Sequence, residues 1–275
     1  MHVGILTAPF ARDDLKTVVD FAADAGFASL ELTCVPGCAH LDPQQYDAAQ
    51  VTDTVAAAGL QISSLACYVD VTHGDPVERQ ANRDALRRAL DACAAMKVDT
   101  LCCIAGRPPE GKSREDTIRD DASPFFNELC RDAAADGIQL AMENWFATNI
   151  QHLGHWDLIF ETCPADNFGL NFDPSHLYWM GIDHLYAVEK FASRIFHTHA
   201  KDTEIRRHVL AYLGNQDHSH WRYVIPGYGE IDWGVYIARL RDVGYNGVLS
   251  IEHEDRAFGR EEGFIKGLRH LSQFC

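Results

Sequence analysis

The chain has 275 residues, of which 47% are hydrophobic and 23% are charged, and its formal net charge at pH 7 is -16. This length suits one α/β barrel of about 250 residues, and the hydrophobic content is enough for a large buried core. A surface this acidic repels nucleic-acid backbones and anionic lipid head groups, which argues against both as partners.

Targeting signals and thiol motifs are absent from the sequence. No basic segment followed by a long apolar core begins the chain, and no apolar run approaches the roughly 20 residues of a membrane span. The nine cysteines include no Cys-x-x-Cys pair, and most lie in or beside apolar runs. These features predict a cytoplasmic protein whose cysteines are small buried residues in a reducing compartment.

Short apolar segments alternate with amphipathic segments eight times along the chain. The short segments lack strict polar alternation, which is typical of parallel strands covered on both faces. They predict strands over residues 3–7, 29–33, 61–68, 100–105, 139–144, 168–172, 195–198 and 248–252. The amphipathic segments predict helices over residues 13–25, 43–58, 77–96, 114–136, 154–163, 184–192, 233–243 and 258–273.

Local signals support several of these helix limits. Asp42 followed by Pro43 has the pattern of an N-cap and a proline at the first helical position. A glycine follows four of the predicted helices, where a left-handed residue commonly ends a helix: Gly26, Gly59, Gly137 and Gly244.

Eight strand–helix units in one chain predict an α/β fold, a single (β/α)₈ TIM barrel over residues 1–275. An open doubly wound sheet is the alternative, but no Gly-x-Gly-x-x-Gly turn follows the first strand. A long loop, residues 201–230, follows the seventh strand. Loops at the carboxyl ends of barrel strands build active sites, so we expect this loop to form a partial lid.

Four predicted strands end on residues that can bind a metal ion: Glu143, Asp173, His199 and Glu252. In a barrel these strand ends meet at one mouth, where buried acidic groups need a compensating charge. A salt bridge would explain any one of them, but all four together favour a metal site. Three carboxylates and one imidazole suit one divalent ion, with Mn²⁺ favoured and Mg²⁺, Co²⁺ or Zn²⁺ also suitable. His197 points the same way as His199 but one layer deeper, so we expect a hydrogen-bonded histidine rather than a fifth ligand.

Five motifs follow one another in order over nearly the whole chain. They are Met-Glu-Asn at 142–144, Asn-Phe-Asp-Pro-Ser-His at 171–176, His-Thr-His-Ala-Lys-Asp at 197–202, Pro-Gly-Tyr-Gly-Glu-Ile-Asp-Trp at 226–233 and Leu-Ser-Ile-Glu at 249–252. With these motifs the sequence resembles the sugar phosphate isomerase/epimerase family of the xylose isomerase-like TIM barrel superfamily. That superfamily includes ketose 3-epimerases, inosose dehydratase, hydroxypyruvate isomerase and endonuclease IV.

The resemblance implies a reaction as well as a fold. It implies that Glu143, Asp173, His199 and Glu252 bind the metal, and that Glu143 and Glu252 are also the catalytic acid/base pair. The two glutamates would remove and return a proton on opposite faces of a carbon beside a carbonyl, while the metal stabilises the enediolate. We therefore expect a metal-dependent epimerase or isomerase acting on a ketose or keto-sugar.

Further residues are candidates for substrate binding at the mouth. The resemblance implies that His176 contacts a substrate oxygen, with a plain hydrogen bond to a carboxylate as the alternative. Lys201 could hold a substrate oxygen and Asp202 could orient a metal ligand, although a rim ion pair would explain both equally well. Arg206 could bind a hydroxyl or a phosphate, and Trp145 could stack on a sugar ring.

Other functions fit parts of the same pattern. An enediolate can also expel a β-hydroxyl, so a lyase or dehydratase acting on an inosose or a 3-keto-glycoside, including glycoside cleavage, is the main alternative. An endonuclease IV-like nuclease is remote, because only His73 could supply an extra ligand after the third strand. Four intact ligand candidates argue against an inactive sugar-binding barrel. The expected partner is a small sugar, and the resemblance allows a homo-oligomer.

Overall fold

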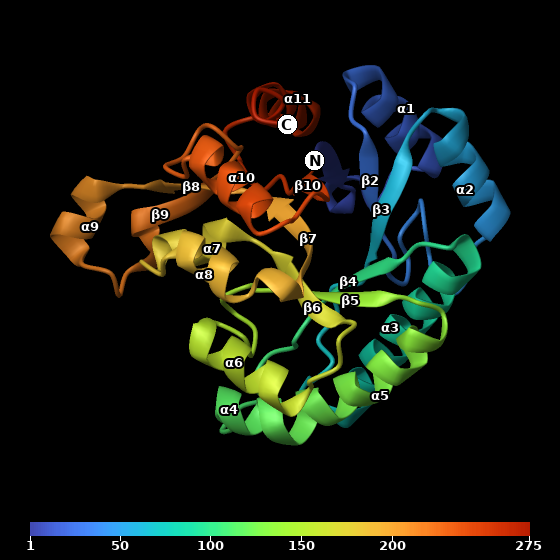
Figure 1. Ribbon diagram of the computed structural model, residues 1–275, viewed down its shortest axis with the longest axis horizontal. Coiled ribbons are helices and arrows are strands. Elements are labelled where there is room, and N and C mark those ends of the chain that lie inside the picture. Colours follow the sequence, from blue (N-terminus) through green and yellow to red (C-terminus); the bar gives the residue numbers. More distant parts are fainter.

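Eight parallel strands close into a barrel with helices around it in the computed structural model, which describes residues 1–275 (Figure 1). The order around the barrel is β1-β10-β7-β6-β5-β4-β3-β2. The predicted (β/α)₈ barrel is therefore confirmed, and every predicted strand exists within two residues of its expected limits. The barrel strands are β1 (His2–Leu6), β2 (Ser29–Thr33), β3 (Gln61–Ala66), β4 (Thr100–Ile104), β5 (Gln139–Glu143), β6 (Phe168–Phe172), β7 (Ile195–Ala200) and β10 (Val248–Ile251).

The outer helices follow the predicted pattern with local differences. They are α1 (Leu15–Ala25), α2 (Ala48–Ala57), α3 (Pro76–Met96), α5 (Ser123–Ala135), α6 (Leu153–Thr162), α8 (His184–Lys190), α10 (Trp233–Asp242) and α11 (Arg260–Leu271). The helix expected over 114–136 is three consecutive segments, because α4 (Arg114–Thr117) continues through a π-helix, Ile118–Ala122, into α5. The four glycines expected to end helices all have positive φ, from 72° to 90°. No helix is both long and apolar enough to cross a membrane.

The expected start of the second helix is wrong. Asp42 does not cap a helix, because its carboxylate accepts hydrogen bonds of 2.8 Å from the backbone N–H groups of Gly37 and Gln44 and so closes a turn. Asp47 is the N-cap of α2 and accepts a 3.0 Å hydrogen bond from the backbone of Gln50. Both aspartates have a side chain that can cap a helix, but the turn at Pro43 delays the start of the helix until after Asp47.

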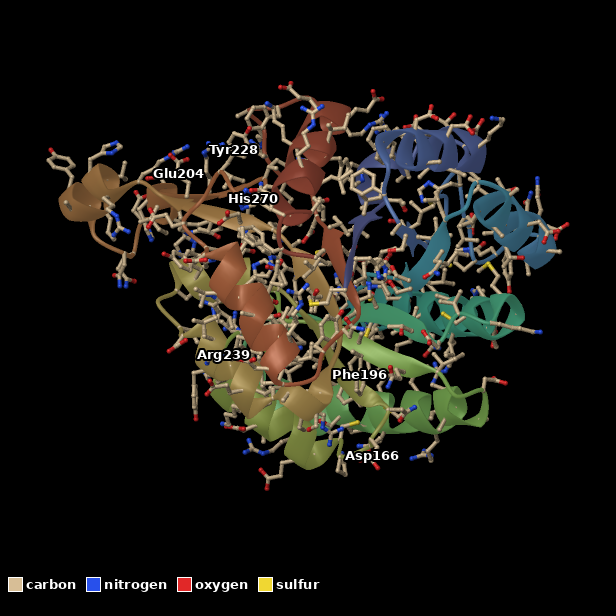
Figure 2. All side chains as sticks on the ribbon, turned by 45° about the horizontal axis from the view of Figure 1, so that its top comes forward. Asp166, Phe196, Glu204, Tyr228, Arg239 and His270 are labelled. Carbon is tan, nitrogen blue, oxygen red and sulfur yellow. The ribbon has the colours of Figure 1, made fainter.

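Residues 202–224 form an arm that projects from the barrel after β7 (Figure 1). In the arm, β8 (Asp202–Ile205) and β9 (Trp221–Val224) pair as an antiparallel sheet, and α9 (Arg207–Leu213) lies at the far end. Glu204 marks the position of β8 in Figure 2. The sequence predicted a loop over 201–230 because these elements are short and α9 has no buried residue to create a pattern. Its action as a lid stays a prediction.

The interior of the barrel is unusually polar. Between barrel and helices lies a continuous apolar core of 59 buried residues, which accounts for the hydrophobic content of the chain. Inside the barrel, a small apolar cluster of Leu6, Ala66, Cys102 and Ala141 shares the space with buried charged and polar groups, among them Glu31, Asn171, His197, His199 and Ser250. Eight of the nine cysteines are buried and all are free, as expected. Polar groups buried at this depth need partners, and those partners define the site described below.

Candidate metal centre

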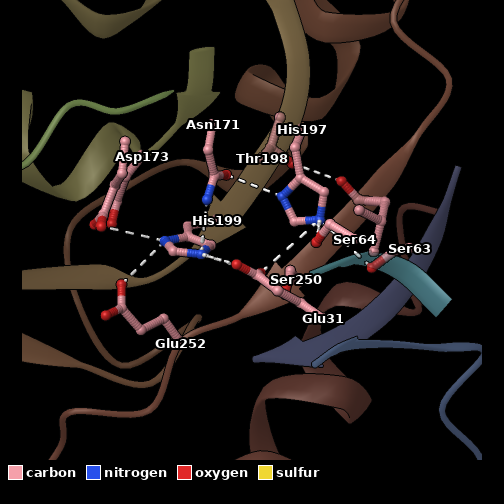
Figure 3. Close-up of polar contacts among 12 residues, drawn as sticks. Glu31, Ser63, Ser64, Asn171, Asp173, His197, Thr198, His199, Ser250 and Glu252 are labelled. Carbon is pink, nitrogen blue, oxygen red and sulfur yellow. Dashed lines mark hydrogen bonds and ion pairs between the residues drawn. The ribbon is translucent and has the colours of Figure 1, made fainter. Parts of the chain in front are cut away.

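Glu143, Asp173, His199 and Glu252 come together at the carboxyl-end mouth of the barrel. Ligand atoms from all four lie within 4.8 Å of one another, and all but Glu252 are fully buried. Glu143 ends β5, Asp173 and Glu252 directly follow β6 and β10, and His199 lies in β7. These four strands are consecutive neighbours in the barrel, so the sequence correctly predicted that the four side chains converge. We call them the ligand cluster (Asp173, His199 and Glu252 are labelled in Figure 3).

The ligand cluster fits a divalent metal ion. Two of its buried atoms, Oδ2 of Asp173 and Nδ1 of His199, make no hydrogen bond, although Nζ of Lys201 lies 3.2 Å from the first of them. Nδ1 of His199 faces two acids, at 3.1 Å from Oε2 of Glu252 and 3.6 Å from Oε1 of Glu143. Buried polar atoms without partners are costly, and a cation among these atoms would satisfy them together. Three carboxylates and one imidazole suit a divalent ion.

Glu31, in the middle of β2, holds the opposite edge of the His199 ring (Figure 3). Nε2 of His199 lies 3.1 Å from Oε2 and 3.2 Å from Oε1 of Glu31. An ionised carboxylate only accepts hydrogen bonds, so Nε2 must carry a proton, and Nδ1 is the ring nitrogen that is available to a metal ion. Sequence reasoning missed Glu31. The one sequence feature that could have indicated it is that Glu31 is a single acid inside the otherwise uncharged strand Ser-Leu-Glu-Leu-Thr.

Glu31 is held in its charged form by a dense set of donors. The hydroxyl of Tyr68 donates to Oε1 at 2.5 Å and that of Ser250 donates to Oε2 at 2.7 Å. Burial raises the pKa of Glu31, but the neighbouring His199 and His197 and the hydroxyl of Tyr68 outweigh it and lower the pKa to about 2. Glu31 therefore stays an acceptor for His199 at any physiological pH.

His197 is buried one layer below the cluster and is hydrogen-bonded, as expected. Its Nδ1 lies 3.0 Å from Oδ1 of Asn171 and its Nε2 lies 3.2 Å from the hydroxyl of Ser64. Burial lowers the pKa of His197 to about 4, so the ring is neutral. Glu31, Cys102 and His197 form a second group of potential ligands, but both ring nitrogens of His197 are already paired.

Lys201 is a buried cation beside the ligand cluster, not a residue of the exposed rim. Only 1% of it is exposed, and its Nζ donates to Oε2 of Glu252 at 2.6 Å and lies 3.2 Å from Oδ2 of Asp173. Burial lowers the pKa of Lys201, but Glu252 and Asp173 raise it well above its ordinary value. The ammonium group thus offsets part of the negative charge of the cluster.

His176 also faces the ligand cluster, from the short helix α7 (Pro174–Trp179). Its Nε2 lies 3.2 Å from Oε1 of Glu143 and 3.5 Å from Oδ2 of Asp173. Its Nδ1 lies 2.5 Å from the hydroxyl of Tyr223 on β9, so the arm touches the cluster through one residue. The sequence placed His176 in a loop, whereas Asp173 caps a helix by accepting a bond from the backbone of Ser175.

Asp202 does not orient a metal ligand, and that expectation is wrong. Its carboxylate instead accepts hydrogen bonds from Trp233 Nε1 at 2.9 Å and from four backbone N–H groups, those of Thr203, Gly227, Gly229 and Ile231. Both glycines of this segment are required by its backbone, since Gly227 has a φ of 89° and a Cβ on Gly229 would clash with the carboxylate of Asp202. Asp202 therefore anchors the segment that leads into α10.

A polar cavity of about 380 Å³ opens above the ligand cluster, and we call it the mouth cavity. Its lining includes Glu143, Glu252, Lys201 and Trp145, together with residues that sequence reasoning did not select, such as Asp70, Arg107 and Glu254. The guanidinium of Arg107 lies 4.6 Å from the ring centre of Trp145. These residues sit in loops and have no repeating pattern in the sequence. A larger cavity of about 780 Å³ beside α1 and α2 contains none of the ligand cluster.

Arg206 lies apart from the mouth cavity, on a second cavity of about 540 Å³ beside the arm. Its Nη1 donates to the backbone oxygen of Ser219 at 3.4 Å. Of the four residues expected to bind substrate, the structure therefore brings Trp145 and Lys201 to the mouth cavity and His176 to the cluster beneath it, but not Arg206.

Comparison with known proteins agrees with this architecture. A family model described as xylose isomerase-like TIM barrel matches residues 19–274. L-ribulose 3-epimerase from Methylomonas sp. is 25% identical over 91% of this chain and 82% of its own length. Inosose dehydratase from Salmonella typhimurium is 22% identical over 99% of this chain and 96% of its own.

A solved structure, that of the IOLI protein with a bound zinc atom, has the same fold. Its TM-score is 0.79 at 18% identity, over 100% of this chain and 99% of that one. The family match spans nearly the whole chain, and the barrel carries its ligand cluster at the mouth. The chain therefore belongs to the xylose isomerase-like TIM barrel family.

Proposed function

We propose that this protein is a divalent-metal-dependent epimerase or isomerase that acts on a ketose or keto-sugar through an enediolate. The observation that carries the proposal is the placement of Glu143 and Glu252. Both carboxylates reach the ligand cluster, but their strands, β5 and β10, are separated in the barrel by β6 and β7. Two carboxylates that approach one point from different sides suit proton removal and return on opposite faces of a carbon. The epimerase activity of a relative supports this choice.

Each residue in and beside the ligand cluster has a role in the proposed reaction. Glu143, Asp173, His199 and Glu252 would hold the ion, which supplies Lewis acidity to stabilise negative charge on a substrate oxygen. One glutamate removes the proton beside the carbonyl and the other returns it. Lys201 holds Glu252 in place through the 2.6 Å hydrogen bond. His176, fixed by Tyr223, presents Nε2 beside Glu143, where it can bind a substrate hydroxyl.

Manganese is the ion we propose for the cluster. Three carboxylates and a single nitrogen form a hard ligand set that suits Mn²⁺ or Mg²⁺, whereas zinc sites are usually richer in nitrogen or sulfur. The IOLI protein, which has the same fold, binds zinc, so Zn²⁺ should be tested together with Co²⁺ in the experiment below.

A dehydratase or lyase is the second candidate, and one observation favours it. Elimination requires a proton donor for the departing hydroxyl in addition to a base. Lys201 and Glu254 lie beside Glu252, with 3.5 Å between Nζ of Lys201 and Oε1 of Glu254, and all three line the mouth cavity. Such a set could deliver a proton to a leaving group, and the relation to inosose dehydratase supports this reading.

Proton exchange in D₂O tests the proposal. The protein would be stripped of metal, reloaded with Mn²⁺, Mg²⁺, Co²⁺ or Zn²⁺, and offered ketoses, inososes and 3-keto-glycosides under NMR. We expect deuterium to enter beside a carbonyl only when metal is present. Exchange should fall at least a hundredfold in Glu143→Gln and Glu252→Gln, as expected for the loss of a general base.

The exposed Glu261, which is outside the site, provides the matched control, and Glu261→Gln should retain full exchange. An epimer or isomer as product would support the first candidate, and an eliminated species would support the lyase. A protein that binds no divalent ion, or exchange that persists in both glutamine variants, would overturn the proposal.

A further inference from the structure

A second cavity lies beside the arm and shares one lining residue with the mouth cavity. This arm cavity has a volume of about 540 Å³, within the usual range for ligand pockets. Glu254 lines both cavities, so they adjoin at that side chain. The other residues that line the arm cavity are Arg206, Trp221, Arg222, Tyr223, Arg256 and Ala257. A molecule that extends from the ligand cluster past Glu254 would enter the arm cavity.

Three arginines line the arm cavity, and two of them have no acidic partner. Arg222 is neutralised by Glu204 and by Asp255, whose Oδ1 lies 2.8 Å from Nη1 of Arg222. Arg206 donates only to a backbone oxygen, and the exposed Arg256 pairs with no carboxylate. On a chain with a net charge of -16, two unpaired guanidinium groups face one lining acid, Glu254, so the cavity has a local excess of positive charge. Guanidinium groups bind carboxylates and phosphates through paired hydrogen bonds.

The aromatic wall of the arm cavity is fixed in place. Trp221 stacks on Trp179 with ring centres 4.5 Å apart and planes 12° from parallel, and it packs against Tyr223 at 4.8 Å. The hydroxyl of Tyr223 reaches Nδ1 of His176, which contacts Glu143. The wall is therefore a firm apolar surface that connects to the ligand cluster through His176, and such a surface suits a planar group.

We propose that the arm cavity is a second subsite, which binds an anionic aglycone (a planar group bearing a carboxylate or a phosphate) joined to the keto-sugar at the ligand cluster. The proposal rests on the proposed function of that cluster, because it places the sugar there. The ring of the aglycone lies on Trp221 and Tyr223, and its anion lies between Arg206 and Arg256. Free sugars would fill only the mouth cavity and would leave both arginines unpaired.

Equilibrium binding of unreactive glycosides tests the subsite. The probes are 4-carboxyphenyl, 4-phosphonophenyl and 4-methylphenyl β-D-glucopyranoside, titrated calorimetrically into the Mn²⁺-loaded full chain. We expect at least one anionic probe to bind about tenfold or more tightly than the neutral one, as one charge-assisted contact allows. The preference between carboxylate and phosphonate identifies the anion. Added salt should reduce the difference, because the arginines are partly exposed.

Substitutions separate the subsite from general electrostatic attraction. Arg206→Gln with Arg256→Gln should abolish the preference for the anionic probes while the neutral probe binds within about twofold of its original affinity. Arg207→Gln is the matched control, because Arg207 pairs with Glu230 and does not line the cavity. This variant should keep the preference for the anionic probes. Equal binding of all three probes, or a preference that survives the double substitution, would overturn the subsite. Because none of the probes reacts, this result is independent of the D₂O exchange test.

Discussion

Glu31 and His199 are joined across the barrel interior by a contact of 3.1 Å between Oε2 and Nε2, with both side chains fully buried. The contact fixes the tautomer of the imidazole and aims Nδ1 at Glu143 and Glu252. A carboxylate behind a ligating histidine makes the ring a better donor and restricts its rotation. The strand β2 therefore supports the proposed metal site, although no atom of β2 belongs to the ligand cluster.

Replacing Glu31 by Gln should weaken metal binding without removing a ligand. The Gln amide can donate to Nε2 of His199, which would favour the tautomer with the proton on Nδ1, where the ion binds. We expect affinity for Mn²⁺ to fall about 10- to 100-fold in calorimetric titration, the usual effect of losing such a partner. The visible spectrum of the Co²⁺ form should change as well, because the coordination of His199 is altered.

Ser250→Ala is the control for the Glu31 substitution. It removes one 2.7 Å hydrogen bond to Glu31 but leaves the carboxylate facing His199. A loss of affinity below about fivefold is expected, since a single hydrogen bond contributes about 1 kcal/mol or less here. Unchanged affinity and an unchanged Co²⁺ spectrum in Glu31→Gln would contradict the role given to Glu31.

Removing the metal should lower the thermal stability of the protein. The carboxylates of the ligand cluster repel one another, and only Lys201 and His199 offset their charge. At a free ion concentration 100 times the dissociation constant, binding adds about 2.7 kcal/mol to the free energy of unfolding. For a chain of this size we expect chelation to lower the melting temperature by about 5–10 °C. A melting temperature that is identical with chelator and with Mn²⁺ would contradict the metal site.

Replacing Lys201 by Met should make stability depend more strongly on metal. The substitution leaves Glu252 and Asp173 buried without their cation, which commonly costs about 3–5 kcal/mol in a buried pair. We expect a lower melting temperature in chelator and a larger rise on adding Mn²⁺ than in the unchanged protein. Lys16→Met is the control, because Lys16 pairs with Asp20 on the exposed face of α1, and no measurable change is expected.

The sequence predicted the barrel and the ligand cluster for the same reason. Strand ends such as Glu143 and Asp173 interrupt strongly apolar runs, and a closed parallel sheet brings those ends to one mouth. Glu31 breaks an apolar strand as well, but it lies at the centre of β2, and its partner His199 is 168 positions away. A pairing across the barrel has no periodic signal in the sequence, so it requires the closed structure.

The arm was unpredictable for a different physical reason. Apolar periodicity arises where a segment packs against a core, whereas α9 has no buried residue and β8 and β9 have only four residues each. Arg206 illustrates the consequence. Its position in the sequence, soon after His199, suggested the mouth of the barrel, but β8 carries it outward to the arm cavity. The two-stranded sheet separates residues that are close in the sequence.

Replacing Asp202 by Ala should destabilise the protein without altering the ligand cluster. The substitution removes the shared acceptor of four backbone N–H groups and of the Trp233 indole, all in or next to buried structure. Each buried donor left without a partner costs about 1–3 kcal/mol, and partial rehydration of the glycine segment limits the sum. We expect the free energy of unfolding in urea to fall by about 3–5 kcal/mol.

Asp232→Ala is the matched control, because Asp232 caps the same helix α10 but is exposed and accepts one bond, from the backbone of Val235 at 3.0 Å. Loss of such a cap should cost only about 1 kcal/mol. Calorimetric titration of folded Asp202→Ala with Mn²⁺ should give the original affinity, since Asp202 touches no member of the ligand cluster. Equal losses of stability in the two variants would contradict the anchoring role given to Asp202. A weaker affinity for Mn²⁺ in Asp202→Ala would show instead that Asp202 supports the metal ligands.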